Sequence, residues 1–184
     1  MTGYFGSIAT WRILLQHKLG VETFALPENN AKALTRTLIA NEKGERQTLS
    51  LPIAGGGHSA RHTDPAEWMV SDHGRWTDVH LGAIQAAYGQ SPYYIHYIDS
   101  LQRILREAPL RPYASLCMGI GEWVDQSIGL SGLLHSLTEL SERNPALLKS
   151  RVESACRGID PSLSIAHVIF HLGPEAIFTL LPAL

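Results

Sequence analysis

Apolar residues recur at helical spacing through most of the second half of the chain. Between Arg75 and Tyr88 they form one stripe, and His80 falls on the same stripe. The same periodicity predicts further helices over about residues 92–105, 112–128, 163–172 and 175–181, and a less regular helical stretch over residues 131–158. We therefore expect a helical part that begins near residue 72.

Residues typical of helix ends flank two of these helices. Ser71 or Asp72 is available to cap the helix that begins near Arg75, and Gly89 can close it. Ser91-Pro92 predicts the start of the next helix, because serine caps well and proline fits the first helical position.

The first third of the chain favours β-structure. After a helix from Ser7 or Thr10 to about Gly20, the pattern predicts a strand at 21–25 and a hairpin of strands 34–40 and 47–51 that turns at Lys43-Gly44. A glycine-rich loop over 53–65 and an extended segment over 66–71 follow. Strands followed by helices predict an α+β fold in one domain, 1–184, with a β-rich part at 1–71 and a helical part at 72–184.

Composition and charge exclude several classes of partner. The 15 basic and 17 acidic residues give a net charge of −2, and no basic run exceeds two residues, so we expect no nucleic-acid binding. No apolar run approaches the ~20 residues of a membrane span. The N-terminus lacks a basic region, and Trp11 and Arg12 interrupt its apolar residues, which predicts a cytoplasmic protein without a signal peptide. Cys117 and Cys156 make no disulfide framework, although one buried bridge stays open.

His80 is the first candidate for chemistry. Burial on the inner stripe would lower the pKa of the imidazole, so the neutral ring could act as a general base or a ligand. The alternative is a core histidine bonded to a tyrosine or a backbone carbonyl.

An arginine and a group of tyrosines are further candidates. Arg36 lies in a predicted strand and needs an anionic partner, either a carboxylate of the chain or the phosphate or carboxylate of a ligand. The tyrosines near residue 90 could hold a sugar or acyl group, or could fill the core. They are Tyr88, Tyr93, Tyr94 and Tyr97.

Metal binding and nucleophilic catalysis have weaker support. His58 and His62 lie in the glycine-rich loop, where spacing sets no common face, so we predict no metal site. That loop does not lead into a helix as phosphate-binding loops do. Cys117 lies in apolar surroundings, where thiols are usually inert.

Four stretches in order along nearly the whole chain carry a family resemblance: YFGSIATW, TRTLIANEKGERQTLSLPI, VSDHGRWTDVHLGAIQAAYGQSPYYIHY and DPSLSIAHVIFHLGPEAI. They resemble the WbqC-like family of bacterial proteins, in the branch associated with Bacteroidetes. The family is named for its association with gene clusters for O-antigen and other cell-surface polysaccharides, so the resemblance implies a role in that pathway. Its polar positions that this chain retains are Arg36, Trp76, His80, Tyr88 and Pro92.

The chain departs from the family at the entry to its first strand. Members usually carry Lys-Gln-Thr-aromatic-Arg-Asn-Arg there, and here only Arg36 survives, after Leu34 and Thr35. If that run binds an anionic substrate, this chain has lost part of the site. Its substrate then differs from that of the family, or the chain is a degenerate member of the family, and both alternatives stay open.

These observations support two hypotheses. The first is a cytoplasmic transferase of surface-polysaccharide biosynthesis that moves an acyl or aminoacyl group to an activated sugar. In it, His80 is the general base, Arg36 binds a sugar or nucleotide-sugar phosphate, and Trp76, Tyr88 and Tyr93 contact the substrate. The second is a non-catalytic binding or scaffold module of the same pathway. The cofactor stays open, and the apolar segment 177–184 predicts a homodimer.

Overall fold

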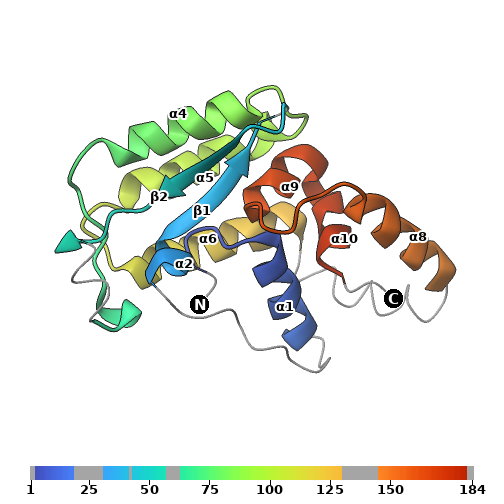
Figure 1. Cartoon of the computed structure of the whole chain (residues 1–184), viewed down its shortest axis with the longest axis horizontal. Coiled ribbons are helices and arrows are strands. Elements are labelled where there is room, and N and C mark those ends of the chain that lie inside the picture. Colours follow the sequence, from blue (N-terminus) through green and yellow to red (C-terminus); the bar gives the residue numbers. More distant parts are fainter. Residues whose placement is uncertain (1–2, 19–30, 42, 57–62, 130–144, 182–184) are drawn as a thin grey trace.

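A two-stranded hairpin packed against helices forms the described part of the chain (Figure 1). The computed structural model describes residues 3–18, 31–41, 43–56, 63–129 and 145–181. Its elements are α1 (Ile8–Lys18), α2 (Ala31–Thr35), β1 (Arg36–Ala40), β2 (Arg46–Ser50), η1 (Pro65–Glu67), α4 (Trp76–Tyr88), α5 (Tyr94–Glu107), α6 (Tyr113–Ile128), α8 (Pro145–Cys156), α9 (Ile165–Leu172), η2 (Gly173–Ala176) and α10 (Ile177–Leu180). A small antiparallel sheet followed by helices is the predicted α+β class.

The hairpin owes its turn to one asparagine and one glycine. The Asn41 side-chain oxygen accepts hydrogen bonds from the backbone N–H groups of Lys43 and Glu45, both at 3.0 Å. Gly44 has a φ of 77°, in the left-handed region that favours glycine. The predicted turn is confirmed, but β1 begins at Arg36 rather than at residue 34, because residues 31–35 form the helical turn α2.

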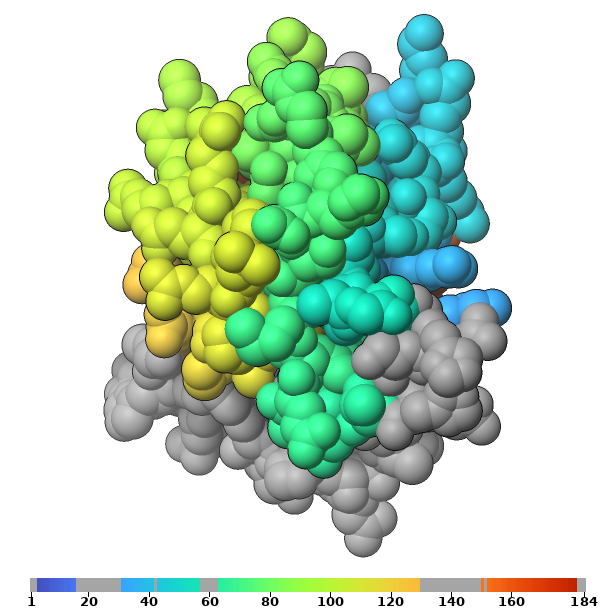
Figure 2. Space-filling view, turned by 90° about the vertical axis from the view of Figure 1, so that its left-hand side faces the viewer, coloured from blue at the N-terminus to red at the C-terminus, as the bar shows by residue number. Residues whose placement is uncertain are grey.

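Helix α9 lies at the centre of the helical part. It contacts β1 and the helices α4, α5 and α6, and all but three of its residues are buried. In the view of Figure 2, α4 (green) lies between the hairpin (blue to cyan) and helices α5 and α6 (yellow). One buried apolar cluster joins side chains from the hairpin and from these helices.

The start of α1 is hydrogen-bonded to the segment before α9, more than 150 residues further along the chain. The N–H of Ile8 donates to the carbonyl of Leu163 at 2.9 Å, and the N–H of Ala9 donates to that of Pro161 at 3.0 Å. Ser7 and Ser164 form an isolated antiparallel bridge. The segment that leads into α9 is thereby fixed to the start of α1.

Two local predictions are wrong, and a third is correct only in part. The N-cap of α4 is Arg75, which makes no side-chain cap bond, because the Ser71 hydroxyl accepts the N–H of His73 instead. Helix α5 begins at Tyr94, and Ser91-Pro92 precede it in a turn. The segment 66–71 includes the end of the short helix η1 before it becomes extended.

The apolar C-terminal segment is used inside the chain. Ile177 and Leu180 are each 1 % exposed, and α10 packs against α1 and α8. The described part of this segment therefore lacks the exposed apolar patch on which the homodimer prediction rests.

Other predictions fall on residues 19–30, 57–62 and 130–144, outside the described residues. These are the strand at 21–25, the middle of the glycine-rich loop and the first half of the irregular helical stretch. Cys117 and Cys156 are free thiols. No helix within the described ranges is both long and apolar enough to cross a bilayer.

Candidate functional site

His80 lies in the core, under the hairpin. It is 4 % exposed and shares the buried face of α4 with Trp76, Ile84 and Tyr88. The hydroxyl of Tyr4, itself fully buried, is 2.7 Å from Nδ1 of His80. The inward position that the helix register predicts for His80 is thus confirmed.

The environment of His80 keeps the ring neutral. Burial lowers its pKa from the usual 6.5 to about 4, and a backbone hydrogen bond with Ser50 only partly opposes this. Burial also raises the pKa of the Tyr4 hydroxyl far above its usual range. The pair is therefore a neutral hydrogen bond between two buried rings, which joins the N-terminal segment to α4.

Trp76 and Tyr88 anchor the two ends of α4. The indole N–H of Trp76 donates to the carbonyl of Ser71 at 2.8 Å. The hydroxyl of Tyr88 accepts the backbone N–H of Ala40 at 3.3 Å, at the end of β1. Both side chains are buried, and Tyr88 is fully so. Their polar atoms are thus engaged by the chain itself.

Tyr93 lies against the turn that follows α9. Its ring is so close to Gly173 that a Cβ at this glycine would be 2.5 Å from ring carbons of Tyr93. Gly173 also has a φ of 54°. The ring of Tyr97 also packs against Tyr93, and the two rings are stacked at a centroid distance of 6.4 Å. Half-buried Tyr93 thus has an internal packing role.

Arg36 has different surroundings from the other candidates. It is exposed at the start of β1, on the wall of a hollow of about 480 Å³ that we call the Arg36 hollow. Its polar lining comes from α1, α2, the hairpin and the segment before α9: Ser7, Thr10, Lys32, Arg36, Thr37, Thr48 and Ser162. The ion pairs between described residues, Arg46–Asp160, Arg75–Asp78 and Arg106–Asp78, involve neither Arg36 nor Lys32.

The structure does not bring the predicted residues onto one wall. Arg36 faces the Arg36 hollow, whereas His80 is covered by Tyr4 and Trp76 and is not part of its lining. Trp76, Tyr88 and Tyr93 are not part of that lining either. The shared site for an imidazole and a guanidinium, which the transferase hypothesis requires, is absent from the described residues.

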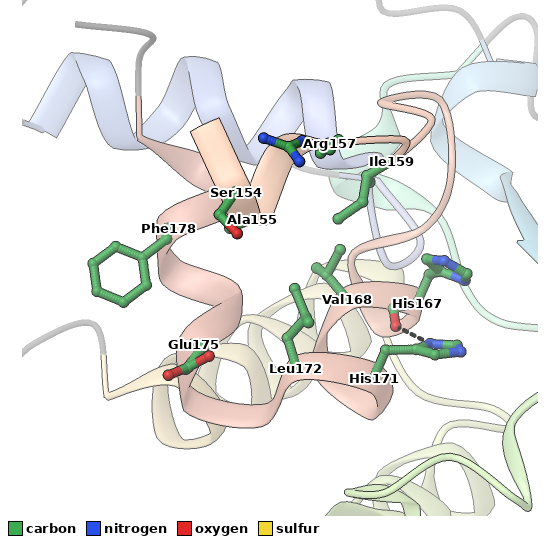
Figure 3. Close-up of a pocket in the computed structure, with 10 residues that line it drawn as sticks. All are labelled: Ser154, Ala155, Arg157, Ile159, His167, Val168, His171, Leu172, Glu175 and Phe178. Atoms are coloured by element: carbon green, nitrogen blue, oxygen red, sulfur yellow. Dashed lines mark hydrogen bonds between the residues drawn. The ribbon is translucent and has the colours of Figure 1, made fainter. Parts of the chain in front are cut away.

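A second hollow, which the sequence reasoning missed, lies between α8, α9 and α10 (Figure 3). It has a volume of about 400 Å³, and we call it the α9 hollow. Apolar side chains and five polar ones line it, the polar ones being Ser154, Arg157, His167, His171 and Glu175. The available signal was the pair of histidines four residues apart on an apolar helix, a spacing that puts both on one face.

The described residues offer no metal centre. No group of three or more histidine, cysteine, aspartate or glutamate side chains among them is arranged to hold a metal ion. His58 and His62 lie outside the described residues.

A comparison with protein-family models assigns the chain to a family. The model of the WbqC-like protein family matches residues 29–160, from α2 to the end of α8 and the loop after it. The chain belongs to the WbqC-like protein family. No curated protein and no solved structure matches it. The WbqC-like match includes Arg36 and His80, whereas α1, α9 and α10 lie outside it. Assignment to the Bacteroidetes branch stays a prediction.

Proposed function

We propose that this WbqC-like protein binds a phosphorylated or nucleotide-activated sugar in the Arg36 hollow, as a cytoplasmic component of bacterial surface-polysaccharide (O-antigen-like) biosynthesis. The observation that carries the proposal is the pairing of two cations, Arg36 and Lys32, with hydroxyl side chains around one hollow. The pathway comes from the family resemblance and the ligand class from the chemistry of the hollow.

The cations suit a phosphate. A guanidinium stays charged at any physiological pH and can donate two parallel hydrogen bonds to phosphate oxygens. Lys32 adds a second positive charge from the neighbouring helix α2. The nearby carboxylate of Asp160 is already paired with Arg46 at 2.6 Å. Asp160 also accepts hydrogen bonds from the hydroxyl and the backbone N–H of Ser162. These two bonds and the charge of Arg46 lower the pKa of Asp160.

The remaining lining suits a sugar. Thr48 and Ser162 place hydroxyl groups on walls that belong to different segments. The hydroxyl of Thr48 can donate to a sugar hydroxyl or accept from one, and that of Ser162, whose proton is given to Asp160, can accept. A volume of about 480 Å³ lies within the range of small-molecule sites. A sugar phosphate, or the sugar-phosphate end of a nucleotide sugar, is therefore the class of ligand that matches both charge and size.

Binding without catalysis is better supported than transfer with His80 as the base. One observation favours transfer, because the lowered pKa of His80 keeps the imidazole in the unprotonated form that a base requires. However, a pKa of about 4 makes a weak base, and Tyr4 occupies Nδ1. We therefore propose the second hypothesis, a non-catalytic binding module, and acyl or aminoacyl transfer stays the alternative.

Calorimetric titration tests the binding proposal. Glucose 1-phosphate and UDP-glucose should bind, whereas glucose should not bind measurably. Arg36→Gln should weaken the binding at least tenfold, because a hydrogen bond to a charged group is lost. Arg103→Gln, at an exposed arginine of α5, is the matched control and should bind as the unmodified protein does. Equal affinity in the Arg36 variant, or no binding of either phosphate, overturns the proposal.

A second measurement separates binding from transfer. His80→Gln should leave the affinity for glucose 1-phosphate unchanged, since His80 does not line the hollow. A loss of turnover with retained binding, in any acyl-transfer assay with the same sugar phosphate, would instead support the transferase alternative.

A further inference from the structure

The exposed face of the hairpin runs along the Arg36 hollow. Successive side chains of a strand point to opposite faces, so Arg36 and Leu38 of β1 share one face. Thr48 of β2 lies opposite Leu38 in the register and therefore shares this face, and all three residues line the hollow. Arg46 is two positions before Thr48, on the same face, and is not part of the lining. The hollow thus follows the hairpin from Arg36 towards Arg46.

The two ends of this face differ in charge. Arg36 and Lys32, at one end, are cations without an ion-pair partner among the described residues. At the other end, Arg46 is neutralised by Asp160 at 2.6 Å. The register places Arg46 opposite Ala40, which is about 13 Å along β1 from Arg36. An anionic group of a ligand therefore finds unpaired cations at the Arg36 end only.

The hydroxyl of Ser162 is a fixed acceptor on the wall of the hollow. Asp160 Oδ1 accepts the hydroxyl of Ser162 at 2.7 Å and its backbone N–H at 2.9 Å. An ionised carboxylate can only accept, so the hydroxyl proton is given to Asp160 and the lone pairs of the Ser162 oxygen stay available. Ser162 is exposed and lines the hollow. A ligand next to Ser162 must therefore bring a donor.

The start of α1 offers a donor instead. Oγ of Ser7 accepts the backbone N–H of Thr10 at 3.1 Å, and the two hydroxyls share one hydrogen bond at 2.9 Å. The pair has two hydroxyl protons and uses one of them internally, whichever residue donates. Neither hydroxyl has a further partner among the described residues, and both residues line the hollow. One proton is therefore left for an acceptor of a ligand.

We propose that the Arg36 hollow holds its sugar phosphate in one orientation, with the phosphate at Arg36 and Lys32 and with a sugar hydroxyl that donates to Ser162. This inference rests on the proposed function and names the residue that selects the sugar. Half-buried Leu38 adds apolar surface to the lining, against which the C–H face of a sugar ring can pack. A sugar that lacks the hydroxyl in question, or carries it as an ether or ester, has no proton for Ser162.

Calorimetric titration with glucose 1-phosphate tests the role of Ser162. Ser162→Ala should bind it roughly five- to tenfold more weakly than the unmodified protein does, because one hydrogen bond is lost. Ser162→Thr keeps a hydroxyl that can donate to Asp160, and it should retain the affinity. Ser154→Ala, at an exposed serine of α8 outside the hollow, is the matched control and should bind glucose 1-phosphate normally.

The 2-, 3-, 4- and 6-deoxy analogues of glucose 1-phosphate identify the donor, since each lacks one hydroxyl. One of them should bind the unmodified protein roughly five- to tenfold more weakly than glucose 1-phosphate does. The same analogue should lose no further affinity in Ser162→Ala, because the missing hydroxyl and the missing acceptor belong to one hydrogen bond. The measurement on the unmodified protein does not depend on how a variant folds.

The outcomes separate this inference from the proposed function. Suppose that glucose 1-phosphate binds and that Arg36→Gln weakens it. The orientation is then wrong if Ser162→Ala binds it normally, or if no deoxy analogue binds the unmodified protein more weakly, and the phosphate site stands. The orientation is also wrong if every deoxy analogue loses as much affinity in Ser162→Ala as glucose 1-phosphate does. If glucose 1-phosphate does not bind, or if Arg36→Gln binds it normally, the proposed function fails and the orientation fails with it.

Discussion

Acid should destabilise this protein through His80, and the effect can be isolated by mutation. The unfolded chain has a histidine pKa of 6.5, whereas the buried ring has a pKa of about 4. Below pH 6.5 the unfolded state therefore takes up a proton that the folded state refuses, and the stability present above pH 6.5 is lost as the pH falls towards 4. Between about pH 7.5 and about pH 5, this difference amounts to roughly 2 kcal/mol for one histidine.

The assay is urea unfolding of the protein and of His80→Gln at both pH values. The glutamine does not titrate, and its side-chain oxygen can still accept the hydroxyl of Tyr4. The loss of unfolding free energy on acidification should be about 2 kcal/mol smaller in the variant. The matched control, His96→Gln, removes an exposed histidine and should keep the full loss of the unmodified protein.

A second readout covers the case in which the variant does not fold. The imidazole signals of His80 in the unmodified protein should show no protonation between about pH 7.5 and about pH 5. If the ring titrates near pH 6.5, or if acid destabilises His80→Gln as much as the unmodified protein, the account of a neutral, desolvated His80 is incorrect.

Three substitutions test the packing around these sites by urea unfolding. Tyr4→Phe should cost about 1–3 kcal/mol, since it leaves Nδ1 of His80 without its partner in the core, and an unchanged stability would argue against that bond. Gly173→Ala should cost roughly 1–3 kcal/mol more than Gly158→Ala, because both glycines have positive φ but only the former would place a methyl group against a tyrosine ring. Equal losses would show that backbone conformation alone matters there. Ser164→Ala should cost about 1 kcal/mol, because its hydroxyl accepts the N–H of Ala166 at the start of α9.

The periodicity of apolar residues predicted the helices well, because the buried face of a helix determines which of its positions are apolar. The stripe that contains His80 is the buried face of α4, and the hairpin turns where Asn41 and Gly44 require it. The caps were predicted less well. Serine is a common helix cap, but the hydroxyl of Ser91 contacts His171, which lies 80 positions later in the chain. Local preference could not anticipate that contact, since it depends on how α9 packs against the start of α5.

The candidate site shows a similar division. The sequence identified Arg36 as a cation in need of an anionic partner, and the structure leaves it exposed beside Lys32. The sequence also predicted that Arg36 and His80 would share a site, and the structure does not bring them together. Whether they meet depends on which face of the hairpin each side chain lies against, and the sequence pattern does not determine this. His167 and His171 were missed because a histidine on a strongly apolar helix resembles a core residue until its neighbours are known.

The bonds that join Ile8 to Leu163 and Ala9 to Pro161 also constrain how the protein can be made. A ribosome releases the first turn of α1 long before it has synthesised the partners of that turn. Until then, no contacts exist that could offset the entropic cost of closing so long a loop. The amides of Ile8 and Ala9 must therefore remain hydrated or find temporary partners. These contacts of α1 therefore cannot form before residue 163 has been synthesised, and chains stalled before residue 161 would lack them.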